Sequence, residues 1–303
     1  FLPKMFFFFF FFQIGFLNFL TMKKFLAFSL AIIGAISVLA QTSVEGIYYN
    51  IDGVTATVTY KNGNPYSGDV TVPDKIIVSN NEYTVTTIGE QAFGYFDVTS
   101  VSLPNTIVEI QTNAFYNCTS LSKATLGDNV TALGKETFSQ CISLQEMIIP
   151  DSVRSIGESC FFGCSTLKDI TIGTGITSIE RSTFSDCSSL SGIAIPKGIT
   201  IIKDYAFSKC SNLSNFIIED RNTSLNLGSN GSSAFFADCP LDSVYIGGKI
   251  TYYTSDYKGY SPFYRNTSLR AVVITDEEKQ IYDNEFYGCT SLKNVSVGNG
   301  VTT

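Results

Sequence analysis

The sequence contains no histidine, and this absence removes several kinds of chemistry at once. Without imidazole there is no Ser-His-Asp triad, no Cys-His pair and no common type of zinc site. The phosphate-binding pattern G-x-x-x-x-G-K-[ST], the nucleophile elbow G-x-S-x-G and the EF-hand loop are missing too. Asp and Glu residues are scattered along the chain, so the sequence does not exclude a catalytic pair of carboxylates. We therefore expect a protein that is not an enzyme and that needs no cofactor and no metal ion.

Charge is scarce as well. Charged residues make up only 16% of the chain, and the net charge is −7. No basic patch is present to neutralise phosphates, so we expect no binding to nucleic acid. The apolar fraction of 44% is large enough for an extended core, and the length allows one or two domains.

Phenylalanine, by contrast, recurs at an almost constant interval. Four consecutive spacings are 23 residues, and two longer ones, of 29 and 27 residues, flank Phe236. A period in the twenties indicates a solenoid, in which each unit contacts only its neighbours and stacking buries a continuous core. The recurring positions are Phe93, Phe115, Phe138, Phe161, Phe184, Phe207, Phe236, Phe263 and Phe286.

Other positions keep a fixed distance from each Phe. An aliphatic residue stands five positions before it, a cysteine three after it and a leucine six after it, as with Ile156, Cys164 and Leu167 around Phe161. Leu241 comes one place early. After the leucine, alternating apolar residues such as Ile170 and Ile172 predict a half-buried strand, which Pro or Gly then ends. The segment around the Phe predicts a short helical or 3₁₀ turn.

This frame resembles the BspA-type leucine-rich repeat proteins over about residues 83–303. Good matches are Val153-Arg-Ser-Ile156-Gly157 with Phe161 and Cys164, and Ile176-Thr-Ser-Ile179 with Phe184 and Cys187. The resemblance implies a leucine-rich repeat solenoid, a β-rich right-handed superhelix of ~23-residue units. It also implies secreted or surface proteins of host-associated microbes, often adhesive, and no enzymatic activity.

The N-terminus predicts export. Met22-Lys23-Lys24, the apolar stretch Phe25–Leu39 and a small-residue site ending at Ala40 are typical of a signal peptide over residues 22–40. Residues 1–21, with a run of Phe, are interpreted as upstream sequence translated by error; a membrane anchor is the alternative. Each apolar stretch is about 16 residues long, short of the ~20 that a spanning helix needs, so we expect no span in the mature chain.

Residues 41–82 are not repetitive and are interpreted as an N-terminal β cap. A hairpin is predicted around Asp52-Gly53, and a further strand at Val70–Val72. Such a cap covers the open edge and core of the first coil. At the other end, Val301-Thr-Thr matches the beginning of another unit, so we expect the solenoid of residues 83–303 to be cut short.

Seven of the eight cysteines occupy one equivalent position per unit. Parallel side chains on successive rungs rarely satisfy disulfide geometry, so we expect a ladder of small buried thiols. Cys160 is the exception, four residues before Cys164. That spacing differs from the C-x-x-C pattern of zinc or redox sites.

Two surfaces are candidates for binding. The first is the outward face of the strands, where Ile148, Ile217, Tyr245 and Val273 stand at positions that solvent would favour as polar; ordinary β-propensity is the alternative explanation. The second is the break in the period on either side of Phe236, where the second of two insertions carries tyrosines that suit recognition but could equally fill an irregular coil. These are Tyr252, Tyr253, Tyr257 and Tyr260.

The sequence thus favours a secreted or cell-surface repeat protein that binds a protein partner, with host components as the expected partner class. A carbohydrate-binding module is a second hypothesis, because tyrosine clusters also stack on sugars. A passive spacer for a further domain is a third. Nothing in the sequence indicates an oligomeric state.

Overall fold

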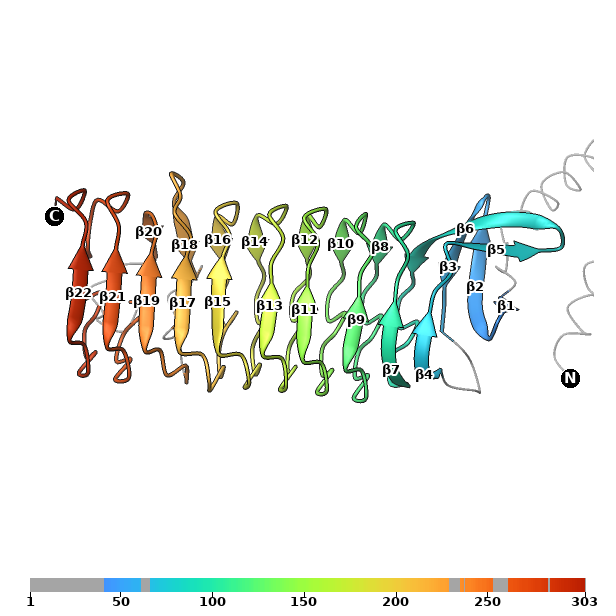
Figure 1. The fold of residues 1–303 in the computed structure, drawn as a ribbon, viewed down its shortest axis with the longest axis horizontal. Coiled ribbons are helices and arrows are strands. Elements are labelled where there is room, and N and C mark those ends of the chain that lie inside the picture. The colour runs from blue at the N-terminus through green and yellow to red at the C-terminus, as the bar shows by residue number, and fades with distance from the viewer. Residues whose placement is uncertain are drawn as a thin grey trace, which may run out of the picture. The chain divides into compact units, whose positions relative to one another are not determined.

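The computed structural model describes residues 41–60, 66–228, 235–236, 238–252, 261–282 and 284–302. These residues belong to one compact unit, Gln41–Thr303. The predicted error segment 1–21 and signal peptide 22–40 lie outside the described residues. Within the described part of the chain, regular secondary structure consists of strands, and turns connect them (Figure 1).

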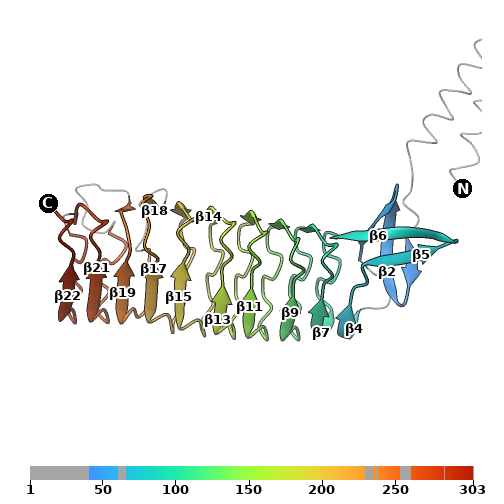
Figure 2. The same ribbon diagram turned by 45° about the horizontal axis from the view of Figure 1, so that its top comes forward.

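The coils form two rows of strands: every coil contributes a strand to the first row, and the coils from β7 to β19 also contribute one to the second. The first row, side by side in chain order in Figures 1 and 2, comprises β7 (Asp97–Ser102), β9 (Lys123–Thr125), β11 (Glu146–Ile148), β13 (Asp169–Thr171), β15 (Gly192–Ile195), β17 (Asn215–Ile218), β19 (Ser243–Ile246), β21 (Ala271–Ile274) and β22 (Asn294–Val297). The second row comprises β8 (Glu109–Ile110), β10 (Ala132–Leu133), β12 (Ser155–Ile156), β14 (Ser178–Ile179), β16 (Ile201–Ile202), β18 (Leu225–Leu227) and β20 (Ile250–Thr251). Paired strands within both rows are parallel, which confirms the predicted leucine-rich repeat solenoid.

The strand register is independent of the length of the connecting segments. Residues Asn215–Ile218 of β17 pair with Ser243–Ile246 of β19 without a shift, although the coil between them is lengthened. The next pairing, of β19 with β21, keeps the same frame. Insertions are therefore absorbed in the connections, and the faces of the strands keep their orientation.

The segment around each Phe forms a chain of tight turns. The N–H groups of Asn113, Phe115 and Asn117 donate to carbonyls of the next coil, whereas those of Ala114, Tyr116 and Cys118 donate three residues back. Asn113 and Asn117 have φ values of 58° and 55°, in the left-handed region. The three-residue bonds expected of a 3₁₀ turn are thus present, but left-handed residues interrupt them, so no regular helix forms.

The Phe side chains form a stacked column through the core. Ring centroids of Phe93, Phe115 and Phe138 lie 5.1 Å apart in each step, with planes within 5° of parallel. The steps from Phe138 to Phe207 are 5.5–5.6 Å. The step from Phe207 to Phe236 widens to 6.4 Å with a 23° tilt, where the first insertion interrupts the period.

The cysteines form a second column and are free thiols. Each repeat-position Sγ donates to the carbonyl oxygen of the Phe in the preceding coil, for example Cys141 to Phe115 at 3.2 Å and Cys187 to Phe161 at 3.2 Å. The predicted ladder of buried thiols is confirmed for all members except Cys289, which is half-buried. The cysteine side chain is thus small enough for this core position, and its thiol also supplies the hydrogen bond that a buried carbonyl oxygen needs.

Six strands precede the first row: β1 (Thr42–Val44), β2 (Ile47–Asp52), β3 (Thr55–Val58), β4 (Ser67–Thr71), β5 (Lys75–Val78) and β6 (Asn81–Ile88). The predicted hairpin is β2 with β3, which pair antiparallel from Asp52 and Thr55 onward. The predicted strand at Val70 lies in β4, which already pairs parallel with β7. The predicted boundary at residue 82 falls inside β6; the division into cap and repeats stays a prediction.

Tyr66 closes the N-terminal end of the Phe column. Its ring lies 4.8 Å from that of Phe93 and 5.5 Å from that of Phe96. Its hydroxyl donates to the Thr59 carbonyl and accepts from the Tyr48 N–H. Burial raises the pKa of Tyr66 to about 12. The aromatic face that the first coil would otherwise expose is therefore covered by this preceding segment.

Candidate functional site: the outer face of the first strand row

Side chains alternate between buried and exposed along β11, β15, β17 and β21 of the first row. On β11, Ile148 is 70% exposed, whereas Met147 and Ile149 on either side of it are 1% exposed. This alternation follows from the pleat, which points successive side chains to opposite faces. The prediction that Ile148, Ile217 and Val273 face outward is confirmed; their role in binding stays a prediction.

Three of the predicted residues lie next to one another. Ile217 pairs with Tyr245, and Tyr245 pairs with Val273, on the adjacent strands β17, β19 and β21. Parallel strands lie about 4.8 Å apart, so these side chains form a continuous row. Ala194 extends this row onto β15, because it pairs with Ile217.

Around this row, the outward positions carry no charge. We call the outward residues of β15, β17, β19 and β21 the uncharged strip. Its members are Gly192, Ala194, Asn215, Ile217, Ser243, Tyr245, Ala271 and Val273. On β9, β11 and β13 the first outward position, which corresponds to Gly192 of β15, carries the charged residues Lys123, Glu146 and Asp169, whereas the second is uncharged there too. The strip is therefore a local feature of the later coils, not a general property of the face.

Polar groups lie at both ends of these strands. The Tyr245 hydroxyl donates to Oδ1 of Asp220 at 2.8 Å, and this bond raises the pKa of Tyr245. At the opposite end, Nε of Arg270 lies 3.3 Å from Oδ1 of Asp242, and both side chains are largely exposed. A partly apolar centre with a polar rim is the arrangement found in protein–protein interfaces.

Ile148 lies apart from the strip. It pairs with Thr171 on β13, and Asp169 and Glu146 on the same face put charges beside it. A single exposed apolar residue on a sheet face requires no functional explanation. The structure thus separates Ile148 from Ile217, Tyr245 and Val273, which the sequence had grouped by position alone.

Of the tyrosines predicted in the second insertion, only Tyr252 lies within the described residues. Its side chain packs against the hydrophobic core, and its ring meets that of Tyr282 edge-on at 5.2 Å. Burial raises its pKa. The alternative that such tyrosines fill an irregular coil therefore describes Tyr252 well. Tyr253, Tyr257 and Tyr260 lie outside the described residues, and binding by any of the four stays a prediction.

The described part of the chain holds no group of three or more His, Cys, Asp or Glu residues arranged to hold a metal ion. Over the same residues, no helix has the length and apolar character that crossing a membrane requires.

Arg221 is a buried residue that the sequence did not single out. It begins the first insertion and is 5% exposed. Its guanidinium donates to the carbonyls of Ile195, Pro196 and Ile199 in the preceding coil. Its position in a polar run, Arg221-Asn-Thr-Ser, gave no signal of burial, because only the tertiary structure brings these three carbonyls together.

Known proteins share this architecture. The profile of the BspA type leucine rich repeat region matches residues 74–187, 133–260 and 258–303. The chain is similar in structure to a leucine-rich repeat protein of T. pallidum, with a TM-score of 0.52 and 26% identity over 58% of this chain and 81% of that chain. It is also similar to the pneumococcal vaccine antigen PcpA, with a TM-score of 0.53 and 18% identity over 87% and 71% of the two chains.

A leucine-rich repeat protein from Bacteroides ovatus is 25% identical over 86% of this chain and 77% of that chain, with a TM-score of 0.49. No curated protein matches the chain. The T. pallidum and pneumococcal structures show the same fold, and the repeat profile spans the whole of the two strand rows. The chain belongs to the BspA-type leucine-rich repeat family.

Proposed function

We propose that this chain is a binding protein without catalytic activity, that it is exported, and that it contacts a protein partner through the uncharged strip. The partner class that we propose, from the family resemblance, is an extracellular protein of a host. The observation that carries the proposal is the unbroken row of Ile217, Tyr245 and Val273 on adjacent strands.

The physical support is the rigidity and the composition of this row. Each residue stands on a strand whose backbone is held on both sides by neighbouring coils, so little side-chain or backbone order has to be gained on binding. Burying an aliphatic side chain contributes on the order of 1–3 kcal/mol, and Tyr245 adds contact area together with a hydroxyl. Charged side chains, whose desolvation opposes binding, stand at the rim.

The proposal is tested with a panel of purified extracellular matrix proteins immobilised on a sensor surface. Ile217→Glu and Val273→Glu place charges within the strip and are expected to weaken binding by at least about tenfold, because an unpaired carboxylate would be buried. Thr125→Glu puts the same charge on the same face of β9, outside the strip, and is the matched control. Equal binding by all three folded variants would contradict the proposal.

Export rests on the sequence of residues 22–40 and has its own test. Expressed with its own N-terminus in a bacterium with a secretory pathway, the protein is expected outside the cytoplasm with Gln41 as its first residue. Intact-mass measurement of the exported protein checks this. A chain that retains Met22 and stays in the cytoplasm would contradict export without affecting the proposed binding surface.

A further inference from the structure

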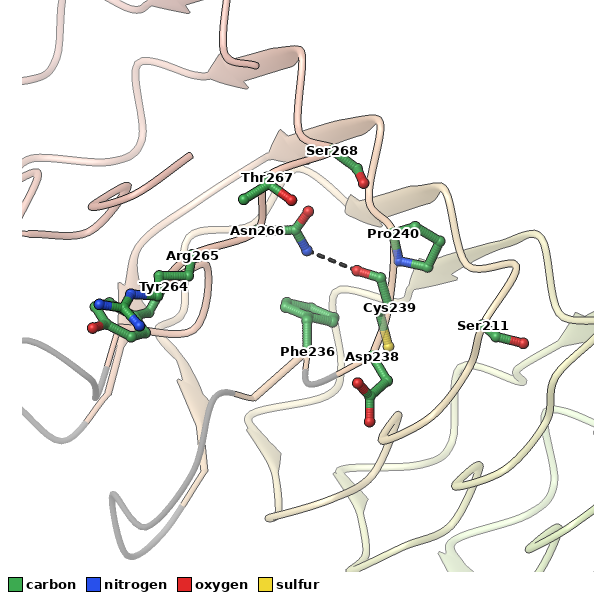
Figure 3. A pocket seen from close by; sticks show the side chains of 10 residues that line it. All are labelled: Ser211, Phe236, Asp238, Cys239, Pro240, Tyr264, Arg265, Asn266, Thr267 and Ser268. Carbon is green, nitrogen blue, oxygen red and sulfur yellow. Dashed lines mark hydrogen bonds between the residues drawn. The ribbon is translucent and has the colours of Figure 1, made fainter. Parts of the chain in front are cut away.

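The later coils differ from the regular ones at the corner beside the cysteine column. The regular corner Cys187-Ser-Ser-Leu190 is one residue longer than the shortened corner Cys239-Pro240-Leu241. In the next coil Asn266 occupies the cysteine position, and its Nδ2 donates to the Cys239 carbonyl at 2.8 Å (dashed in Figure 3). A side-chain amide thus replaces the thiol in joining this coil to the one before it.

The second strand row shows a replacement of a similar kind at β20, where it ends among the described strands. Leu225 of β18 pairs with Ile250 of β20, and the Leu225 N–H donates to the backbone carbonyl of Lys249 in the next coil. The Ile250 N–H, one coil later, donates instead to Oε2 of Glu278 at 2.8 Å. A side-chain carboxylate therefore takes the place of the backbone carbonyl of the following coil.

Glu278 is only 2% exposed and accepts hydrogen bonds on both carboxylate oxygens. Besides the bond from Ile250 to Oε2, the N–H groups of Lys279 and Gln280 donate to Oε1 at 2.8 Å and 3.2 Å. The ammonium group of Lys279 donates to the carbonyl of Asp276 and not to Glu278. Backbone groups, and no cation among the described residues, thus bind this carboxylate.

A second buried acid, Glu285, lies near Glu278 and is 3% exposed. Its Oε2 accepts the Tyr282 N–H at 2.9 Å. Burial is the main cause that raises the pKa of Glu285 to about 7; the charge of Glu278 raises it further, whereas the Tyr282 N–H and the Tyr252 hydroxyl lower it. None of the described groups that act on Glu285 is a cation.

The two acids hold the chain on both sides of the second insertion, which leaves the described residues after Tyr252 and rejoins them at Ser261. Glu278 bonds Ile250 before the insertion, and the Glu285 carbonyl accepts a hydrogen bond from the Ser261 hydroxyl after it. The rings of Tyr252 and Tyr282 meet edge-on at 5.2 Å between these two bonds in the sequence. We call these residues the acid joint: Ile250, Tyr252, Ser261, Glu278, Tyr282 and Glu285.

The other side of the same coils is held without titratable groups. Residues Ser243–Ile246 of β19 pair with Ala271–Ile274 of β21, and β21 pairs in turn with β22. These bonds join backbone amides and carbonyls, which neither gain nor lose a proton between pH 4 and pH 9. The two sides of one coil therefore respond differently to pH.

We propose that the acid joint is a proton-operated hinge between the coil of β20 and the coil that follows it. With a proton on Glu285, the joint holds the two coils together on the side of the second strand row. When the proton leaves, two negative charges share one buried site, which is costly, and the joint opens. The paired strands β19 and β21 are the axis of this opening, and the Tyr252 ring becomes exposed.

The direction of the pH dependence follows from linkage. In the open form the Glu285 carboxyl is solvated and releases its proton near its ordinary pKa of 4.5, whereas in the closed form it does so at about 7. The joint is therefore fully held below about pH 4.5, and its contribution is lost as the pH rises through 7. The hinge does not involve the uncharged strip, so it is independent of the proposed binding function.

Hydrogen exchange of the whole protein at pH 5 and pH 8, read as protection factors that remove the intrinsic pH dependence of exchange, tests the hinge. Protection of the Ile250 and Tyr282 amides is expected to fall by at least about tenfold between the two pH values. The amides of Phe161 and Leu167 in a regular coil are the reference and are expected to keep their protection.

Two variants locate the effect. Glu285→Gln has no proton to release at this position and is expected to keep the protection of Ile250 and Tyr282 equal at both pH values. Glu146→Gln is the matched control, because Glu146 is exposed on β11, and is expected to respond to pH as the wild type does. Carbon-detected NMR of the Glu285 carboxyl gives its pKa directly in the wild type and does not depend on either variant.

The proposal is overturned if Ile250 and Tyr282 of the wild type are equally protected at pH 5 and pH 8. It is also overturned if Phe161 and Leu167 lose protection to the same extent, because the whole unit would then open and not one joint. A Glu285 carboxyl that titrates near 4.5 in the folded protein would overturn it as well, whether or not Glu285→Gln folds.

Discussion

At the start of the first insertion, Arg221 buries a guanidinium against backbone carbonyls of the preceding coil. Among the described residues it bonds no carboxylate; the carbonyls of Ile195, Pro196, Ile199 and Glu219 accept its hydrogen bonds. Desolvation lowers its pKa, and Glu219 offsets part of this effect. The residue thus joins the inserted segment to the regular coil by hydrogen bonds instead of apolar packing.

We predict that Arg221→Met lowers the free energy of unfolding by about 3 kcal/mol, because buried carbonyls lose their donors at about 1 kcal/mol or more each. Chemical denaturation checks this. Arg181→Met is the control, since Arg181 is exposed and contacts the ring of Tyr205 at 5.2 Å. It should change stability by less than about 0.5 kcal/mol. Equal losses in the two variants would refute the role given to Arg221.

Glu285 gives the fold a pH dependence. Burial raises its pKa from 4.5 to about 7, and Glu278 adds like-charge repulsion, although the Tyr282 N–H offsets part of the shift. Between about pH 4.5 and pH 7, the Glu285 carboxyl group keeps a proton in the folded protein that the same group has released in the unfolded chain. Stability from this group is therefore complete below about pH 4.5 and is lost as the pH rises through 7.

The loss should amount to about 3 kcal/mol at most. Melting temperatures from pH 4 to pH 8, compared between the wild type and Glu285→Gln, isolate this contribution. The glutamine variant has no proton to release at this position, so its melting temperature should fall less across the range. Parallel curves for the two proteins would show that Glu285 does not titrate as described.

At the scale of the coil, the Phe column joins each coil to its neighbours through stacked rings. Phe161 lies between two stacked neighbours, at 5.5 Å from Phe138 and 5.6 Å from Phe184. Phe286 is half-buried and stacks on Phe263 at 5.3 Å. A ring in the middle of the column therefore has more contacts to lose than Phe286.

We predict that Phe161→Ala costs about 4 kcal/mol and Phe286→Ala about half of that, because the cost of a cavity grows with the contacts that are removed. Urea denaturation followed by circular dichroism measures both. A larger loss of stability in Phe286→Ala than in Phe161→Ala would contradict the greater contribution given to rings in the middle of the column.

The elements themselves were largely predictable from the sequence. Alternation such as Ile170-Thr-Ile172 specifies a strand and its buried face, so the exposure of Ile148 followed directly. The turns around Phe were less predictable, because left-handed residues such as Asn113 and Asn117 hold the backbone by bonds to the next coil. A single-sequence pattern does not contain these partners, which lie more than twenty residues away.

Across the whole described unit, the bonding between coils is uneven. The Phe N–H donates to the next coil at Phe93, Phe115, Phe138, Phe161 and Phe184. No such bond joins described residues at Phe207, Phe236 or Phe263, although the first strand row continues through these coils. Among the described residues, the turn segments beyond Phe184 are thus joined by fewer of these bonds than the earlier ones.

Native-state hydrogen exchange should detect this difference. The amides of Phe115, Phe138 and Phe161 are expected to exchange at least about tenfold more slowly than those of Phe207 and Phe236, because local opening there breaks fewer bonds between coils. The strand amides of Ile193 and Val244 serve as internal references. Uniform protection of all five Phe amides would contradict this division.

Function was less accessible from the sequence than fold. The strand face could be assigned from alternation, but the grouping of Ile217, Tyr245 and Val273, without Ile148, required the register between strands. The early position of Leu241 was visible in the sequence. Its effect on the surface was not, because the shape of this corner depends on where the corners of Ser211 and Thr267 in the neighbouring coils lie in space.

The shortened corner at Cys239-Pro240-Leu241 leaves β17, β19 and β21 in register. The loss of a single codon can thus shorten a corner without shifting the register of the strands beside it. Corner length and strand composition can then evolve separately in a chain of this design. Gene duplication of coils followed by such small deletions would diversify the surface while the scaffold persists.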